Sequence, residues 1–333
     1  MNRRSPLAVL AALALLAACD KDSDVEVPAE LIDIQQTVAV KKVWSSSVGD
    51  AKPKLRLGLS LAYDDGVLFA AARNGNVEAL DAASGKRRWR VDTKLDLSAG
   101  PGVGGGKVVV GTNDGDVLAL NAGSGDKLWR VKVRGEVLAP PLVTADYVVV
   151  RTVDGWLLAL DGNDGSERWS VEELVPRLTL RGNSSPILSG DTVVCGFDNG
   201  RVVAVSLSGG DILWQTQVSI PRGRTELERL SDIDANLRIA DGDIYVVGYH
   251  GRVAMLALDT GQVWWGRDLS SYSGLDLDQE RVFVTGSDGS VVALRRPDGG
   301  VVWQQDALLY RRLSAPAVTG QYIVVGDLDG YLH

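Results

Sequence analysis

Residues 111–133 read GTNDGDVLALNAGSGDKLWRVKV, and the rest of the chain repeats this unit. An apolar run at residues 108–110 leads into it, a turn follows at Asp114-Gly115, and a strand-like run covers residues 116–120. A second turn, AGSG, precedes a last run that carries Trp129. Alternating β-branched and apolar residues predict strands, and Asp-Gly or Gly-rich breaks predict tight reversals. The unit therefore predicts short antiparallel strands joined by hairpins.

The same unit recurs with a nearly constant period. Its closing tryptophans lie 40, 40, 45, 51 and 38 residues apart, at Trp89, Trp129, Trp169, Trp214, Trp265 and Trp303. A period near forty residues with about four short strands is typical of a β-propeller blade. Units open with small or proline-containing runs such as Ala139-Pro140-Pro141, which suits a first strand crowded at the central axis. The large tryptophan is expected on the outermost strand, packed between neighbouring blades.

The two ends of the repeat array predict how the ring closes. Residues 38–48, VAVKKVWSSSV, are strand-like and place Trp44 in the same setting as the later closing tryptophans. A lone outer strand at the start predicts that it completes the last blade, because closure removes exposed strand edges. The chain stops at His333, inside the third strand of its seventh repeat. We therefore expect an all-β propeller with eight four-stranded blades in the intact protein, seven being the alternative, and an incomplete C-terminus here.

The N-terminus has the features of a bacterial lipoprotein leader. Residues 1–18 combine a basic start with an apolar stretch and end in small residues, which predicts a signal peptide. Leu16-Ala17-Ala18-Cys19 resembles a lipobox, in which Cys19 is lipidated and becomes the mature N-terminus. The expected organisation is a signal peptide at 1–18, lipidated cysteine and flexible tether at 19–37, and propeller at 38–333. Asp20 favours inner-membrane retention in some bacteria, so the membrane that holds the anchor is left open.

Charge and composition exclude several classes of function. The formal net charge of −8 argues against a protein that binds the phosphate backbone of nucleic acid. Two histidines, His250 and His333, leave few general bases, and Cys195 lies in an apolar strand where it has no disulfide partner. No zinc-binding pattern is present, and Asp-Gly pairs fall at the same hairpin of each unit, where turn chemistry explains them. We expect no enzyme activity, no metal and no cofactor.

A glycine motif needs separate treatment. Residues 100–105, GPGVGG, formally match the G-x-G-x-x-G pattern of dinucleotide-binding loops. That pattern requires a strand before it and a helix after it, whereas residues 107–111 read as a strand. The motif therefore carries little weight as a cofactor site.

Two inserts break the rhythm of the repeats. Insert one is residues 170–183, SVEELVPRLTLRGN, and insert two is residues 215–234, QTQVSIPRGRTELERLSDID. Both lie between a closing tryptophan and the next blade, hence on the same side of the disc. Loops longer than the topology requires are where function is usually carried. We expect the inserts to lie close together, and the candidate residues in them are Leu178, Leu180, Arg181, Arg222, Arg224, Asp232 and Asp234. Alternatively, the leucines face a core and the charges are merely solvated.

The repeat phrase A-L-D-x-x-x-G-x-x-x-W resembles the tryptophan-docking repeat of quinoprotein-type propellers. With the lipobox, LTLRG at 178–182 and RGRTELERLSDID at 222–234, the chain resembles the BamB family of outer-membrane assembly factors over almost its whole length. The resemblance implies a non-catalytic periplasmic lipoprotein of the outer membrane that docks on POTRA domains of the barrel insertase. Leu178, Leu180, Arg181, Asp232 and Asp234 match family residues implicated in that docking.

Two alternative functions remain from the sequence. The repeats also resemble dehydrogenases that use pyrroloquinoline quinone, although the adjacent cysteine pair of the alcohol-oxidising members is absent and histidine is scarce. A propeller scaffold of another envelope complex is the second alternative. Unfolded outer-membrane proteins are possible further partners, by pairing with exposed blade edges.

Overall fold

The computed structural model describes residues 26–33, 38–49, 58–176, 178–182, 184–220, 224–225 and 230–333. All regular secondary structure in these residues is β-strand, which confirms the predicted all-β class. Across these residues no helix has the length and the hydropathy that are needed to cross a membrane.

Six sheets, here called blades 1 to 6, follow one another in chain order in the described residues, each built on four antiparallel strands, with a fifth strand added in blade 2. Blade 1 contains β2 (Leu61–Asp64), β3 (Val67–Ala71), β4 (Asn76–Asp81) and β5 (Arg87–Asp92). Blade 2 contains β6 (Leu97–Gly104), β7 (Lys107–Thr112), β8 (Asp116–Asn121) and β9 (Lys127–Lys132), and the short β1 (Gly58–Leu59) pairs with β6 in parallel. Blade 3 contains β10 (Leu142–Val143), β11 (Tyr147–Arg151), β12 (Trp156–Asp161) and β13 (Glu167–Glu172).

The later blades repeat this order. Blade 4 contains β14 (Ile187–Ser189), β15 (Thr192–Gly196), β16 (Arg201–Ser206) and β17 (Ile212–Gln217). Blade 5 contains β18 (Arg238–Ala240), β19 (Asp243–Val247), β20 (Arg252–Ala257) and β21 (Val263–Asp268). Blade 6 contains β22 (Gly274–Leu277), β23 (Arg281–Thr285), β24 (Val291–Arg295) and β25 (Val301–Gln305). A seventh sheet begins with β26 (Ala317–Thr319) and β27 (Tyr322–Val324).

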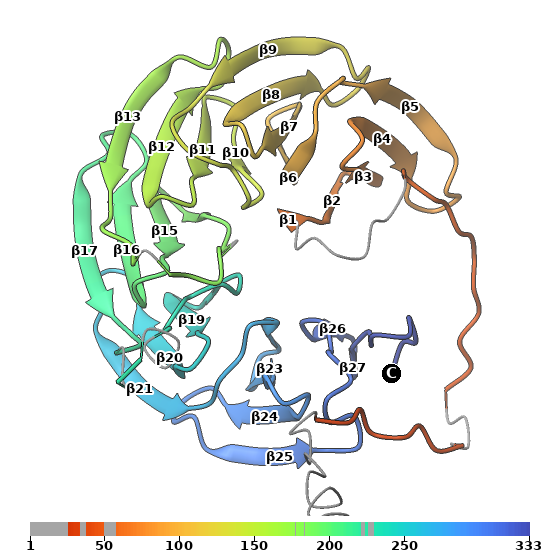
Figure 1. Cartoon of the computed structure of the whole chain (residues 1–333), viewed down its shortest axis with the longest axis vertical. Helices are drawn as coiled ribbons and strands as arrows, with labels where there is room; N and C mark the ends of the chain where they lie inside the picture. Colours follow the sequence, from red (N-terminus) through yellow and green to blue (C-terminus); the bar gives the residue numbers. More distant parts are fainter. Residues whose placement is uncertain are drawn as a thin grey trace, which may run out of the picture.

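The blades stand around a ring, with the first strand of each blade inside and the fourth strand outside (Figure 1). Buried apolar side chains form separate clusters, and each cluster combines residues of two neighbouring blades. Val109 of blade 2 and Val148 of blade 3, for example, belong to one cluster. This division of the core is what a propeller requires, because each blade contacts its neighbours along the ring.

The closing tryptophans of blades 1 to 5, and Trp44 before them, dock on the blade that follows. In these residues the indole N–H donates to a backbone carbonyl at the hairpin between the third and fourth strands of the following blade, at 2.7–3.0 Å. The pairs are Trp44–Ala82, Trp89–Ala122, Trp129–Gly162, Trp169–Leu207, Trp214–Leu258 and Trp265–Arg296. A glycine of that hairpin with positive φ receives the ring; at Gly165, a Cβ atom would lie 2.7 Å from the ring of Trp129. The predicted position of the tryptophans is therefore confirmed.

A shift in the register between the third and fourth strands sets the direction in which the closing tryptophans point. In all six blades the pairing of the third and fourth strands shifts immediately after the residue opposite the tryptophan, for example after Ala119 opposite Trp129. Such a bulge re-aims side chains and increases the local twist. The alanine of the A-L-D phrase is the residue opposite the tryptophan in most repeats, which explains why a small residue stands there.

Residues 38–49 run along the outside of the ring toward blade 1 (Figure 1). Trp44 docks on Ala82 in the same way as the later tryptophans, as the repeat pattern predicts. Residues 38–49 are not assigned as a strand, however, because no described strand pairs with them. The number of blades in a closed ring stays a prediction, and Cys19 with the whole predicted signal peptide lies outside the described residues.

Candidate functional site

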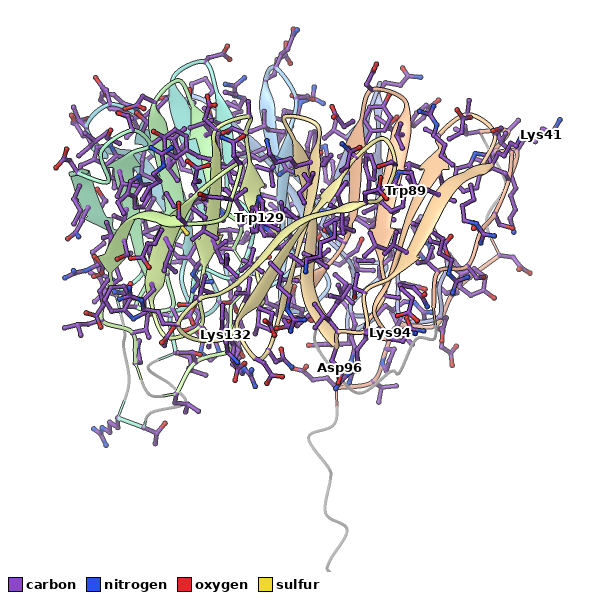
Figure 2. All side chains as sticks on the ribbon, turned by 90° about the horizontal axis from the view of Figure 1, so that it is seen from above. Lys41, Trp89, Lys94, Asp96, Trp129 and Lys132 are labelled. Carbon is purple, nitrogen blue, oxygen red and sulfur yellow. The ribbon has the colours of Figure 1, made fainter. Side chains whose placement is uncertain are left out.

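Both inserts leave the ring on one face of the disc. Strands β13 and β17 take up the first three residues of each predicted insert, to Glu172 and Gln217, and the inserts continue from there. The green and teal loops protrude from the face on which Lys94, Asp96 and Lys132 lie (Figure 2). The turn between the second and third strands of each blade lies on the same face, because the connection to the next blade hydrogen-bonds to it, as in Val133 N–H to Gly115 O at 2.8 Å.

The two inserts contact each other directly. The Leu180 N–H of insert one donates to the Asp232 carboxylate of insert two. Gly182 approaches Asp234 so closely that a Cβ atom at Gly182 would lie 2.1 Å from an oxygen of Asp234. The predicted proximity of the inserts is therefore found in the structure, through the end of insert one and the end of insert two.

Arg151, the last residue of β11, binds the end of insert one from inside the protein. Its guanidinium donates to the Gly182 carbonyl at 2.7 Å and pairs with Asp198, and both charged side chains are buried. The guanidinium also lies over the ring of Phe197, 5.4 Å from its centroid. Sequence reasoning missed Arg151 and Asp198. A signal was present, because the positions equivalent to Arg151 in the other blades carry small, apolar or threonine residues, namely Ala71, Gly111, Gly196, Val247 and Thr285.

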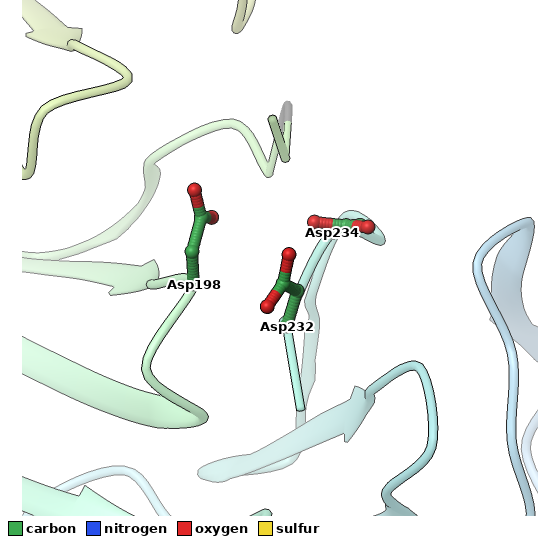
Figure 3. Close-up of side chains that lie close together, drawn as sticks. All are labelled: Asp198, Asp232 and Asp234. Carbon is green, nitrogen blue, oxygen red and sulfur yellow. The ribbon is translucent and has the colours of Figure 1, made fainter. Parts of the chain in front are cut away.

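Three buried carboxyl groups meet where the two inserts join: Asp198, Asp232 and Asp234 each offer an oxygen within 4.8 Å of the others (Figure 3). Burial raises the pKa of Asp232 to about 7, with the Leu180 N–H and Arg151 opposing this shift and Asp198 adding to it. Burial disfavours the charge of Arg151, but Asp198, Cys195 and Asp234 together outweigh burial and raise the pKa of the guanidinium. Because a cation from the chain already pairs with Asp198, the cluster is organised as an internal ion-pair network.

The exposed residues of the inserts include three apolar side chains and Arg181. Leu174 is 85% exposed, Leu178 39% and Ile220 60%. Arg181 has a positive φ of 58° and pairs with Glu136 at the surface, where both side chains remain substantially exposed. We call Leu174, Leu178, Arg181 and Ile220 the insert surface. Leu174 and Ile220 were not among the residues singled out from the sequence.

The other predicted site residues divide into two groups. Leu180 is half-buried, and Asp232 and Asp234 are buried, so these three side chains lie beneath the insert surface. Arg224 is exposed, whereas Arg222 lies outside the described residues. Leu178 belongs to no strand and does not face a core, unlike in the alternative interpretation of the sequence.

The residues that were considered as candidates for enzyme chemistry lie in a buried strand, in a strand and its turn, and in a surface turn. Cys195 is fully buried, and burial raises the pKa of its thiol to about 12. The GPGVGG motif begins within β6 and continues into the turn before β7, so the strand-turn-helix context of a dinucleotide site is missing there. His250 lies in a turn, as its place in the repeat predicts.

Comparison with known proteins gives a consistent result. A family model described as outer membrane protein assembly factor BamB matches residues 40–94 and 73–305. The curated BamB of Alkalilimnicola ehrlichii is 51% identical over 100% of this chain and 86% of its own length. That of Escherichia coli is 37% identical over 99% of this chain and 88% of its own length. The crystal structure of BamB from Moraxella catarrhalis has a TM-score of 0.78 at 32% identity, covering 84% of this chain and 85% of that one.

Proposed function

This chain belongs to the family of the outer membrane protein assembly factor BamB, and from that premise we propose that its insert surface holds a POTRA domain of the outer-membrane barrel insertase. The chain is then a non-catalytic scaffold of the assembly machinery, which acts by binding. Family membership argues against the dehydrogenase alternative, because the relatives carry the name of an assembly factor over the full length of the match.

The observation that carries the proposal is the exposed apolar residues beside Arg181. Leu178 supplies apolar area that a partner can desolvate, and the guanidinium fork of Arg181 suits a partner carboxylate. Its ion pair with Glu136 is exposed, and such pairs contribute about 0–1 kcal/mol to stability, so exchange for a partner carboxylate costs little. Truncating a central anchor of this kind typically costs about 2 kcal/mol or more of binding free energy.

The buried network gives Asp232 and Asp234 an indirect role in this proposal. Both side chains are out of reach of a partner, but Asp232 binds the Leu180 N–H and Asp234 packs against Gly182. Together with Arg151 they fix the backbone that presents Leu178 and Arg181. A preorganised loop binds more tightly because less conformational entropy is lost on association.

The location of the protein follows from the same premise. The family name places it with the outer-membrane assembly machinery, and we propose that a lipid on Cys19 anchors it there, facing the periplasm, through the tether up to residue 37. Fractionation of inner and outer membranes, with a Cys19→Ser variant released into the soluble fraction, tests the anchor and shows which membrane Asp20 selects. Equal membrane retention of the Cys19→Ser variant would refute lipidation.

Calorimetric titration of POTRA domains into the lipid-free chain tests the docking site. Arg181→Glu is expected to weaken binding more than tenfold, because it replaces the fork with a charge that repels a carboxylate. Lys127→Glu is the matched control, since it makes the same charge change at an exposed position of β9 far from the inserts. Tight binding by the Arg181→Glu variant would refute the site, and no binding by the folded wild-type chain would refute the function.

A further inference from the structure

The turn between β19 and β20 of blade 5 differs from its counterparts. In the other six repeats this turn has Asn or Asp before a glycine of positive φ, at Gly75, Gly115, Gly155, Gly200, Gly289 and Gly330. Blade 5 reads Tyr249-His250-Gly251, and here His250 has the positive φ, 47°, while Gly251 does not. A left-handed conformation is less favourable for histidine than for glycine, so the remodelled turn needs a reason beyond reversing the chain.

The remodelled turn gathers aromatic rings at the surface. The His250 ring stacks on Tyr249 with centroids 4.0 Å apart and planes at 22°. Tyr272, from the connection that follows β21, lies with its ring centroid 6.2 Å from that of Tyr249. Tyr249 and Tyr272 are half-buried and His250 is exposed. We call these three residues the aromatic cluster.

The aromatic cluster adjoins the insert surface. The Tyr249 N–H donates to the Asp232 carbonyl at 2.9 Å, while the side chain of the same Asp232 accepts from Leu180. Asp232 therefore joins the turn of blade 5 to insert one. On the other side, His250 and Ile220 line one cavity of about 270 Å³.

The same turn also contacts the beginning of insert two. A Cβ atom at Gly251 would lie 2.1 Å from the Ser219 hydroxyl oxygen, so this position requires glycine for its close approach. The backbone of the turn thus contacts insert two near both of its ends, at Ser219 and at Asp232.

We propose that the aromatic cluster is a second contact region of the docking surface and packs against the same POTRA domain that the insert surface holds. This inference rests on the proposed function. Tyrosine rings supply large contact area with few rotatable bonds and are enriched at the energetic centres of protein interfaces. A stable interface buries roughly 800 Å² on each partner, and a footprint that spans blades 4 and 5 meets this requirement better than one loop. The fitting partner surface is apolar.

The test is the affinity of a Tyr249→Ser/Tyr272→Ser variant for POTRA domains, measured by calorimetry beside Arg181→Glu. We expect the double variant to bind at least tenfold more weakly than the wild type. Tyr63→Ser is the matched control, because Tyr63 is 64% exposed on β2 and lies in blade 1. If the double variant binds within twofold of the wild type while Arg181→Glu binds weakly, the inference is wrong and the proposed function stands. If the wild type does not bind, both are wrong.

A second measurement keeps an aromatic ring in place and so guards against misfolding. Benzoylphenylalanine is expected to form a photo-crosslink to the barrel insertase in intact cells when it replaces Tyr249, and likewise when it replaces Leu178. A crosslink from position 178 without one from position 249 would overturn the inference.

Discussion

At the scale of single residues, Arg151 fixes the position of the end of insert one. It is a buried cation that replaces a small or apolar residue of the repeat, and its two hydrogen-bond partners belong to insert one and to the turn of blade 4. A buried ion pair is weak evidence for stability in itself, because desolvation offsets the attraction between the charges. Its value here is that it connects two segments that the regular repeat would leave apart.

Breaking this pair is expected to be costly. Arg151→Met leaves the buried Asp198 without its guanidinium, and removing one partner of a buried pair typically lowers the free energy of unfolding by about 3–5 kcal/mol. Arg295→Met removes a pair with Asp298 in which both side chains are 57% exposed, and should cost about 1 kcal/mol or less. Urea unfolding followed by circular dichroism measures both. Similar losses in the two variants would show that the buried pair is not special.

Asp232 makes the stability of the chain depend on pH. Its pKa rises from 3.8 to about 7 in the folded state, so between these values the folded chain holds a proton that the unfolded chain has released. The contribution of Asp232 to stability is therefore present at low pH and is lost as pH rises through about 7, by at most about 1.4 kcal/mol per pH unit.

Asp232→Asn isolates this effect, because asparagine keeps an acceptor for the Leu180 N–H and does not titrate. Relative to the variant, the wild type is expected to lose stability between pH 4 and pH 7 and to change little above pH 8. Urea midpoints across this range measure the difference. A difference that is constant with pH would contradict the raised pKa.

At the scale of elements, the unit of assembly is a closing tryptophan with the hairpin of the next blade. The tryptophan contributes a large apolar surface and one hydrogen bond, and the hairpin contributes a carbonyl and a glycine that leaves room for the ring. Neither half is stable alone, since a four-stranded blade buries its faces against neighbours.

Trp129→Ala tests this unit. Trp129 is 6% exposed, so its removal leaves a cavity between blades 2 and 3 and should cost about 3–5 kcal/mol of unfolding free energy. Trp264→Ala is the control, because Trp264 is 52% exposed and donates to Asp243 at the surface, which predicts a loss of about 1 kcal/mol or less. Equal losses in thermal and urea unfolding would mean that docking by the closing tryptophans does not hold the blades together.

At the scale of the whole molecule, the repeats made the architecture predictable. Regular turns, closing tryptophans and their spacing are local signals, and each blade repeats the same local packing problem, so the propeller and the meeting of the two inserts followed from the sequence. Burial did not follow, because it depends on contacts between distant segments. Asp232 and Asp234 are charged residues in a long loop, which usually indicates exposure, yet Arg151 and Gly182 enclose them. The exposure of Leu174 and the stacking of His250 on Tyr249 were hidden for the same reason.

The head-to-tail docking of the tryptophans also has a consequence for how such a chain can evolve. The described junctions between blades 1 and 6 each join the same donor side to the same acceptor side, so the blades between them carry one of each. A tandem copy of a gene segment coding for one unit therefore brings its own matched halves, and both new joints are already compatible. Duplication can enlarge a ring of this kind in a single genetic step, while the loops on its faces diverge independently of the joints.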